Sequence, residues 1–357
     1  MRIGLIYGGR SAEHTVSIES AKGVHQALLQ LHHEILLIGI SKEGKWYLQQ
    51  HIVNPIQCTE PLFLLPADGI YSNKGKLSID VAFATTHGTG GEDGNLQGLC
   101  FLCNIALCGC STVSSALGMH KALASKLFAA HNIPVVPSIT IDSQQDIEDI
   151  QLFEMICSEL GKDLFVKPES SGSSIGVQAL KQASHRALVK AVNDALLYSD
   201  RVLVQKLIDP LIELECGILR TQAGALVVAG PGRVVDVAKD QDACLSYRHK
   251  YGPVNTAYLQ IPSMVSSDIE NRIKDYAISA FTAIACDGYA RLDFFVQEEQ
   301  VYLNEINTIP GMTEKSHYPI LLASSGYAMP EVLEHLMHDA VRRFKEEQSR
   351  EYRAPEI

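Results

Sequence analysis

Apolar runs alternate with amphipathic stretches along the first part of the chain, and this pattern predicts strands and helices in turn. Residues 1–7 form an apolar run that ends at Gly8 and Gly9. An amphipathic segment follows over residues 17–29, and a second apolar run covers residues 34–40. Strand, helix and strand at this spacing favour a parallel α/β unit.

A further strand is predicted over residues 79–85, directly before His87 and Gly88. Ligands of open α/β sheets bind at the carboxyl ends of the strands, where Gly8, Gly9 and His87 fall. A dinucleotide site is the weaker interpretation, because the double glycine lacks the full GxGxxG pattern.

The middle of the chain predicts a phosphate-binding loop. A helix is expected over residues 115–132, carrying Lys121, and a strand over residues 164–167, ending at Lys167. The Ser/Gly-rich segment 168–176 comes next. Such loops present backbone N–H groups and hydroxyls to phosphate oxygens, although an ordinary flexible hairpin loop is the alternative.

Residues 289–319 carry the most informative pattern, which predicts two strands around a polar turn at 297–300. Residues two apart on a strand share a face, so Arg291 groups with Asp293, and Glu305 groups with Asn307. If the strands pair, two carboxylates and one carboxamide converge beside a guanidinium. Such oxygen donors suit Mg²⁺ better than zinc. The alternative is a solvated hairpin face, but Asp and Asn are unfavourable within strands.

Composition narrows the class of protein. A chain of 357 residues usually makes two or three domains, and 46% hydrophobic residues suffice for sizeable cores. The net charge of −11 argues against a general nucleic-acid binder, but it does not exclude a small anionic ligand. The sequence shows no apolar run long enough to cross a membrane and begins with a strand pattern, so we expect a cytoplasmic protein.

Four of the nine cysteines crowd into residues 100–110, at Cys100, Cys103, Cys108 and Cys110. Their spacing resembles a metal knuckle only loosely. Cys100 and Cys103 fit the apolar face of a short helix, and Cys108 fits a strand after it. Buried small hydrophobic residues are the favoured interpretation, and a metal or redox site is the alternative.

Several motifs occur in one order along the chain: GGRSAEHTVS, HGTGGEDGNLQG, FVKPESSGSSIGV, HKY, ARLDFF and LNEINTIPGMT. Together they resemble the D-alanine–D-alanine ligases of the ATP-grasp superfamily from residue 1 to about residue 344. The resemblance implies an α/β fold of three domains, over residues 1–112, 113–204 and 205–357. The first is a parallel α/β domain, and the other two are ATP-grasp α+β domains that hold ATP between them.

The resemblance also implies a reaction. ATP phosphorylates one D-alanine to an acyl phosphate, and the amine of a second D-alanine displaces the phosphate. The product would feed peptidoglycan synthesis, and the protein would be a homodimer. Two Mg²⁺ or Mn²⁺ ions would bridge the ATP phosphates.

Site residues are carried over from matching motif positions. The metal ligands would be Asp293, Glu305 and Asn307. The phosphate contacts would be Lys121, Lys167, Ser174 and Lys250, and the adenine and ribose contacts would be Gln205, Lys206, Ile208 and Glu213. The catalytic residues would be Glu13, Ser173, Tyr251, Arg291 and Gly311, of which Arg291 and the Gly311 N–H would face the oxyanion. The substrate contacts would be His87, Ser316 and His317. The segment 242–255, with Lys250 and Tyr251, would close over bound ATP.

Some positions depart from the family pattern, namely Cys108, Cys110, His120, Ser171, Gln205, His249 and His317. None is a phosphate or metal ligand, so they bear on specificity. Glu215 is the alternative to Glu213 at the ribose. A ligase of the same fold that joins D-alanine to D-serine or D-lactate is the nearest alternative function. A nucleotide-binding regulator without catalysis is the alternative from another class.

Overall fold

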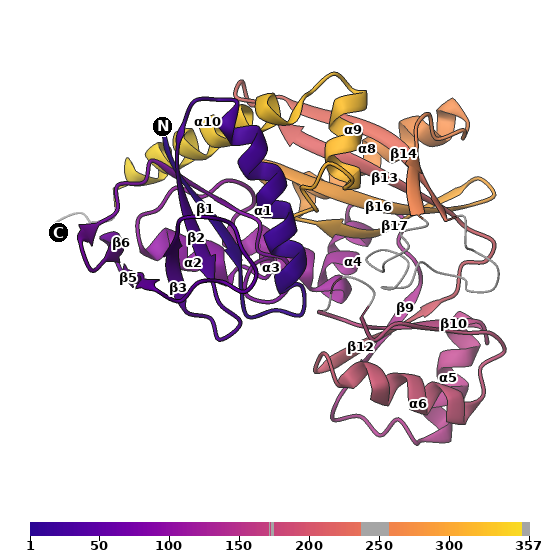
Figure 1. Ribbon diagram of the computed structural model, residues 1–357. Coiled ribbons are helices and arrows are strands. Elements are labelled where there is room, and N and C mark those ends of the chain that lie inside the picture. The colour runs from indigo at the N-terminus through magenta and orange to yellow at the C-terminus, as the bar shows by residue number, and fades with distance from the viewer. Residues whose placement is uncertain (171, 173–174, 237–256, 352–357) are drawn as a thin grey trace, which may run out of the picture.

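The computed structural model describes residues 1–170, 172, 175–236 and 257–351, arranged as three lobes of strands and helices (Figure 1). The sheet of the first lobe has the order β4-β3-β2-β1-β8. Its strands are β1 (Arg2–Gly8), β2 (Glu34–Ile40), β3 (Trp46–Gln49), β4 (Glu60–Pro61) and β8 (Val81–Ala84). Strand β1 pairs in parallel with β2 and β8, which confirms the predicted parallel α/β unit.

The remaining elements of the first lobe are helices and a small three-stranded sheet. The small sheet consists of β5 (Phe63–Leu65), β6 (Gly69–Ser72) and β7 (Gly75–Lys76). Its helices are α1 (His14–Leu29) and α2 (Asn95–Leu102), and α3 (Thr112–Met119) and α4 (Lys121–Ala130) follow at its border with the third lobe, against which both pack. Helix α1 starts three residues earlier than expected and packs on β1.

The single helix predicted over residues 115–132 was wrong, because the segment forms two helices. The Ser111 side chain caps the start of α3, and His120 leaves the helical conformation at φ −83° and ψ 86°. Gly118 lies close to Thr308, where a Cβ atom would come within 3.0 Å of a Thr308 methyl group. The break places Lys121 at the first position of α4, close to β17 of the third lobe.

The central lobe is an antiparallel sheet in the order β11-β10-β12-β9. Its elements are β9 (Ser138–Asp142), α5 (Ile150–Leu160), β10 (Leu164–Pro168), β11 (Gln178–Leu180), α6 (His185–Leu196) and β12 (Arg201–Lys206). The two helices and the sheet enclose a hydrophobic core of their own. Strand β12 straddles the predicted boundary at 204/205, so the sheet of this lobe extends to Lys206.

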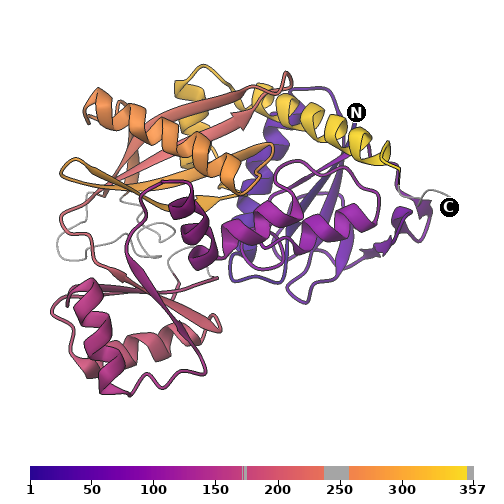
Figure 2. The same ribbon diagram turned by 180° about the vertical axis from the view of Figure 1, so that it is seen from behind.

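The third lobe has an antiparallel sheet in the order β15-β14-β13-β16-β17. Its strands are β13 (Ile212–Arg220), β14 (Leu226–Asp236), β15 (Ala257–Gln260), β16 (Tyr289–Gln297) and β17 (Gln300–Asn307). Its helices are α8 (Ser267–Ala283), α9 (His317–Ser324) and α10 (Met329–Gln348). Helix α8 packs in one hydrophobic core with this sheet and α9 in another, so the two helices cover opposite faces (Figure 2).

The first and third lobes share a continuous core. Helix α10 runs back from the third lobe and packs on α1 and β8 (Figure 1). Tyr289 and Tyr318 of the third lobe lie in the same buried cluster as Ile3, Leu5 and Phe83 of the first. The hydrophobic core of the central lobe, by contrast, is separate from this shared core.

A β-bulge shapes the β16–β17 hairpin. Asp293 pairs with Glu305, but Phe294 pairs with Leu303, so Asn304 is the extra residue on β17. Leu303 and Phe294 lie in the core beneath the sheet. Without the bulge, Glu305 would share the core face with Leu303, because residues two apart on a strand point the same way. The bulge therefore turns Glu305 to the side of Asp293.

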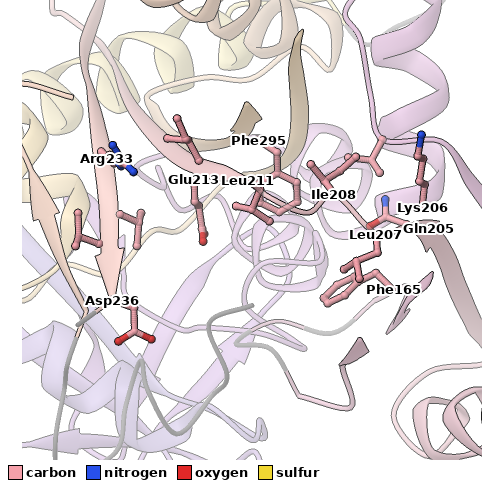
Figure 3. Close-up of a pocket in the computed structure, with 14 residues that line it drawn as sticks. Phe165, Gln205, Lys206, Leu207, Ile208, Leu211, Glu213, Arg233, Asp236 and Phe295 are labelled. Atoms are coloured by element: carbon pink, nitrogen blue, oxygen red, sulfur yellow. The ribbon is translucent and has the colours of Figure 1, made fainter. Parts of the chain in front are cut away.

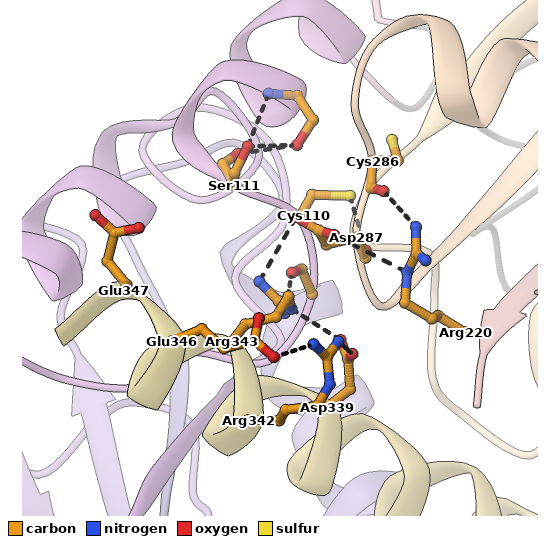
Figure 4. A network of polar contacts seen from close by, with 12 residues as sticks. Cys110, Ser111, Arg220, Cys286, Asp287, Asp339, Arg342, Arg343, Glu346 and Glu347 are labelled. Carbon is orange, nitrogen blue, oxygen red and sulfur yellow. Dashed lines mark hydrogen bonds and ion pairs between the residues drawn. The ribbon is translucent and has the colours of Figure 1, made fainter. Parts of the chain in front are cut away.

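A buried acid ties α10 to the loops between the first and third lobes (Figure 4). The Asp339 side chain is fully buried, and its oxygens lie 2.7 Å from Nη2 of Arg342 and 2.8 Å from Nε of Arg343. Arg343 also donates to the backbone oxygen of Gly109 at 2.9 Å. Its guanidinium lies 3.7 Å from Asp287, so this network joins three separate segments.

We expect Asp339→Ala to lower the free energy of unfolding by about 3 kcal/mol, because Arg343 would lose its buried partner. Urea denaturation would measure this. The control is Glu346→Ala, which removes an exposed partner of Arg342 and should cost about 1 kcal/mol or less. Equal small losses in both variants would contradict a stabilising role for the network.

The clustered cysteines are buried, as the favoured interpretation expected. Burial raises the pKa of the Cys100 thiol to about 12 and also raises that of Cys108. Cys108 donates its backbone N–H to Ala82, but beside β8 there is only an isolated bridge at Leu107, not the strand predicted there. Among the residues described, no group of three or more His, Cys, Asp or Glu side chains could hold a metal ion. No helix within the described ranges is long and apolar enough to span a membrane.

Candidate functional site

A cavity of about 200 Å³ lies between the central and third lobes (Figure 3). Residues of β10, β12, β13, β14 and β16 and of the loop after β12 line it, including Phe165, Gln205, Lys206, Ile208, Glu213, Arg233 and Phe295. Figure 3 shows Glu213 between Arg233 on one side and the segment from Gln205 to Ile208 on the other. An apolar slot with a few polar groups suits a flat heterocycle such as adenine. All four residues predicted to contact adenine and ribose therefore line one pocket.

The two glutamates of β13 have different surroundings. Glu213 lines this cavity and the larger one beside it. Glu215 is buried, with its carboxylate 2.8 Å from Nδ1 of His317 and 3.3 Å from Nε of Arg291. Of the two, Glu213 is the one beside the residues predicted to bind adenine, as the preferred alignment expected.

The larger cavity, of about 520 Å³, is lined by residues of all three lobes. The sequence-predicted residues along it are Glu13, His87, Lys121, Lys167, Glu213, Arg291, Glu305, Asn307, Gly311, Ser316 and His317. The two cavities share Phe165, Glu213 and Phe295, so the smaller opens beside the larger. Residues from segments nearly 300 positions apart thus face one space.

The hairpin side chains converge as predicted. The Arg291 guanidinium binds both oxygens of Asp293, each at 2.8 Å, and Asn307 donates to Asp293 at 3.2 Å. Asp293 pairs with Glu305 across the strands. Burial raises the pKa of Asp293 to about 7 against the lowering effect of Arg291, with Glu215 and Glu305 adding to the rise.

This cluster fits a divalent cation. Carboxylate and amide oxygens are the donors that Mg²⁺ and Mn²⁺ accept, and a cation would offset the burial and the carboxylate repulsion that raise the pKa of Asp293. Asp293, Glu305 and Asn307 would hold it.

Two lysines reach the same hairpin from other segments. Nζ of Lys121 lies 3.7 Å from Glu305, and Nζ of buried Lys167 donates to Oδ1 of Asn304 at 3.1 Å. Both lysines line the larger cavity, so two positive charges stand beside the acidic cluster. The sequence analysis missed Asn304. The apolar spacing of Val301, Leu303 and Ile306 signals the bulge that turns it toward Lys167.

Glu13 lies at the meeting point of the first and central lobes. It is buried, and a Cβ atom on Gly88 would come within 2.6 Å of its carboxylate. A Cβ atom on Gly172 would come within 2.9 Å of the same group. Gly88 also has a φ of +72°, which favours glycine, and Gly172 shows that the Ser/Gly loop approaches Glu13 closely.

His87 is buried nearby, with Nε2 2.9 Å from Oγ of Ser20. Burial opposes its protonation, but the Glu92 and Glu13 carboxylates outweigh burial and raise the pKa of His87. A cationic imidazole is thereby favoured at this wall of the larger cavity.

The opposite wall is formed by the loop before α9. Ser316 accepts a hydrogen bond from the backbone N–H of Thr313 at 3.1 Å. A Cβ atom at Gly311 would come within 2.8 Å of Oγ of Ser316, so glycine is needed there. His317 follows at the first position of α9. Gly311, Ser316 and His317 are therefore grouped as predicted.

Four predicted site residues, Ser173, Ser174, Lys250 and Tyr251, lie outside the described residues, as does most or all of the predicted closing segment 242–255. Ser171 and His249 also fall outside.

Three lobes, a heterocycle-sized pocket between the second and third, and lysines beside an acidic hairpin together define an ATP-grasp type of protein. Two family models identify the family within this class. "D-ala D-ala ligase N-terminus" matches residues 2–110, and "D-ala D-ala ligase C-terminus" matches residues 127–338. The chain belongs to the D-alanine–D-alanine ligase family.

Known proteins resemble the chain over nearly its whole length. D-alanine--D-alanine ligase A of Brucella melitensis is 33% identical over 96% of this chain and 98% of its own. The D-alanine-D-alanine ligase structure from Coxiella burnetii is similar with a TM-score of 0.83 at 32% identity, covering 98% of this chain and 97% of that one. VanG D-Ala:D-Ser ligase from Enterococcus faecalis has a TM-score of 0.81 at 27% identity, covering 95% of this chain and 99% of that one.

Proposed function

We propose that this protein joins two D-alanines to D-alanyl-D-alanine, with ATP as phosphoryl donor and a D-alanyl phosphate as intermediate. The observation that carries the proposal is the connection of the two cavities through Phe165, Glu213 and Phe295. A nucleotide in the smaller cavity would direct its phosphates toward Lys121 and Lys167 in the larger one. Family membership supports the same reaction.

The proposed roles of the site residues follow from their charges. Lys121 and Lys167 would bind phosphate oxygens, since phosphoryl transfer needs positioning and charge neutralisation above all. The two Mg²⁺ or Mn²⁺ ions, held by Asp293, Glu305 and Asn307, would neutralise the remaining phosphate charge. Glu13 would accept the ammonium group of the first D-alanine beside His87. Ser173, Ser174, Lys250 and Tyr251 keep their proposed roles in phosphate binding and closure.

Once the acyl phosphate has formed, the second amine attacks its carbonyl carbon. Arg291 and the N–H of Gly311 would stabilise the oxygen that gains negative charge. Ser316 would bind the carboxylate of the second D-alanine. A closed site would protect the acyl phosphate from water.

We expect Glu213→Ala to raise the KM for ATP about tenfold while kcat changes little, because a ribose contact serves the ground state and the transition state equally. Steady-state kinetics at saturating D-alanine would measure both constants. Glu299→Ala on the distant hairpin turn is the control. A large fall in kcat with unchanged KM would contradict the ribose assignment.

The direct test is ADP and phosphate release from ATP with and without D-alanine, followed by product analysis. A nucleotide-binding regulator would release no phosphate in response to D-alanine.

The second acceptor is expected to be D-alanine. With D-alanine, D-serine and D-lactate at equal concentration and neutral pH, D-alanyl-D-alanine should be the main product. D-lactate must attack through a hydroxyl, which is a weaker nucleophile than an amine. D-serine ligation is the second candidate, favoured by the similarity to VanG D-Ala:D-Ser ligase and by His317 near the acceptor. Mainly depsipeptide or D-alanyl-D-serine would overturn the expectation.

The proposal includes a cytoplasmic homodimer that supplies peptidoglycan precursors. Exposed apolar side chains on α2 and β5 support association, with Phe63 52%, Phe101 54% and Leu102 61% exposed. Contiguous exposed apolar surface marks association sites, and these side chains are the candidates for it. Sedimentation equilibrium would measure the mass in solution.

A further inference from the structure

His317 and Glu215 form an imidazole–carboxylate pair on the wall of the larger cavity, and the steps above do not use it. Nδ1 of His317 lies 2.8 Å from Oε2 of Glu215. The Glu215 side chain is only 2% exposed, whereas that of His317 is 20% exposed. The carboxylate is thus buried, the ring is the more exposed partner, and both side chains line the cavity.

This hydrogen bond determines the tautomer of the ring. In a neutral imidazole one nitrogen donates and the other accepts. The ionised carboxylate accepts from Nδ1–H, so the lone pair is on Nε2. Nε2 has no hydrogen-bond partner among the residues that the structure describes. His317 is therefore an oriented proton acceptor.

The pair lies beside the proposed oxyanion site. The same Oε2 of Glu215 is 3.3 Å from Nε of Arg291. One buried carboxylate therefore orients both the guanidinium and the imidazole. The charged groups around His317 are Glu215 on β13, Arg291 on β16 with Asp293 beyond it, and Lys315 in the loop before α9.

We propose that His317 is the general base that takes a proton from the amino group of the second D-alanine, and that Glu215 is its positioning residue. The assignment rests on the proposed function. It is supported by the neighbouring Ser316, because an acceptor whose carboxylate binds Ser316 would have its amino group close to the adjacent side chain.

The proton balance requires an acceptor of this kind. A D-amino acid at neutral pH carries an ammonium group, which has no lone pair. One of its protons moves to Nε2 of His317, and the freed lone pair forms the C–N bond. The C–O bond to phosphate then breaks with its electron pair, and the second surplus proton leaves on the phosphate. His317 returns its proton to solvent when the product leaves.

The test compares two nucleophiles in His317→Asn. Asparagine can keep a donor near the position of Nδ1, and so keep a partner for Glu215, but it has no group at Nε2. With D-alanine as acceptor, kcat should fall about 100-fold, the low end of general-base effects. Hydroxylamine is largely unprotonated at neutral pH and traps the acyl phosphate as a hydroxamate. In His317→Asn, the loss of hydroxamate formation should therefore be at least about tenfold smaller than the loss of dipeptide synthesis.

The pH profile gives a second readout. Wild-type kcat/KM for the second D-alanine should depend less steeply on pH than that of His317→Asn, because a base on the protein replaces the free amine that only high pH supplies. In His317→Asn it should keep rising to about pH 9, as solution supplies more free amine. His338→Asn, at an exposed ring on α10, is the matched control and should keep the wild-type profile.

Glu215→Gln tests the positioning role. It should lower kcat for D-alanine much more than hydroxamate formation, since the amide no longer holds the ring through Nδ1 as the carboxylate does. Equal losses for D-alanine and hydroxylamine in His317→Asn would overturn the proposal, as would an unchanged dipeptide rate. A wild-type protein without D-alanine-dependent ADP release would refute the proposed function instead, so the two failures are distinguishable.

Discussion

Asp293→Asn should reduce dipeptide synthesis by at least about 1,000-fold at ordinary Mg²⁺ concentrations, which is the largest effect expected here. Asp293 and Glu305 pair across the hairpin, beside Lys121 and Asn307. Their charges would hold the cations that neutralise the phosphates of ATP, and a neutral amide holds such ions weakly. Coupled ADP release at several Mg²⁺ and Mn²⁺ concentrations would measure the loss. Glu305→Gln should behave in the same way.

Folding should not suffer from Asp293→Asn. The raised pKa of Asp293, about 7, means that the folded state binds this proton more tightly than the unfolded state. The charged carboxylate therefore lowers stability progressively as pH rises toward 7, and the cost is complete above it. At about pH 8, without Mg²⁺ or ATP, the variant should melt no lower than wild type. Near-normal turnover in both Asp293→Asn and Glu305→Gln would refute the metal assignment.

Arg291→Ala should lower kcat about 100- to 1,000-fold, in the range seen when an oxyanion donor is removed. ATP affinity should change much less, because the guanidinium faces charge that develops only in the transition state. Stopped-time product assays and ATP calorimetry would separate the two quantities.

Arg291→Lys is the matched variant, since it keeps the positive charge but loses the two-pronged contact with Asp293. It should recover only part of the rate. If ATP binding collapsed in Arg291→Ala while turnover at saturation stayed normal, Arg291 would be a nucleotide contact.

Much of the fold could be predicted from local patterns. The parallel unit around β1, the hairpin of β16 and β17 and the closing helix α10 follow from the spacing of apolar residues, which is a property of each segment alone. The break at His120 could not be found in this way. The backbone changes direction at one residue, and nearby Gly118 fits closely against Thr308, which lies 190 positions away in sequence.

The candidate site shows the same difference between features that local sequence predicts and features that depend on distant residues. The described residues of the recognisable motifs lie together as predicted, because the motifs themselves contain the charged residues and the glycines. Glu215 was considered only as a ribose contact, since its partners Arg291 and His317 come from β16 and α9. Asn304 was missed because strict alternation along β17 would place it on the opposite face from Glu305. The sequence sign of the bulge is the spacing of three positions between the apolar residues Leu303 and Ile306.

The bulge at Asn304 lets β17 carry one more residue than β16 over the same stretch, while Glu305 and Asn307 stay on the side of Asp293. Deleting this one residue would restore strict alternation along β17, with Leu303 and Ile306 on the core side and Glu305 and Asn307 still on the side of Asp293, so only the contact of Asn304 with Lys167 would be lost. Insertions at the turn near Glu298 lie outside the paired positions and leave the count between Leu303 and Glu305 unchanged. A change of one residue at either point thus leaves Glu305 and Asn307 on the side of Asp293, and what the extra residue Asn304 adds is a side-chain partner for Lys167.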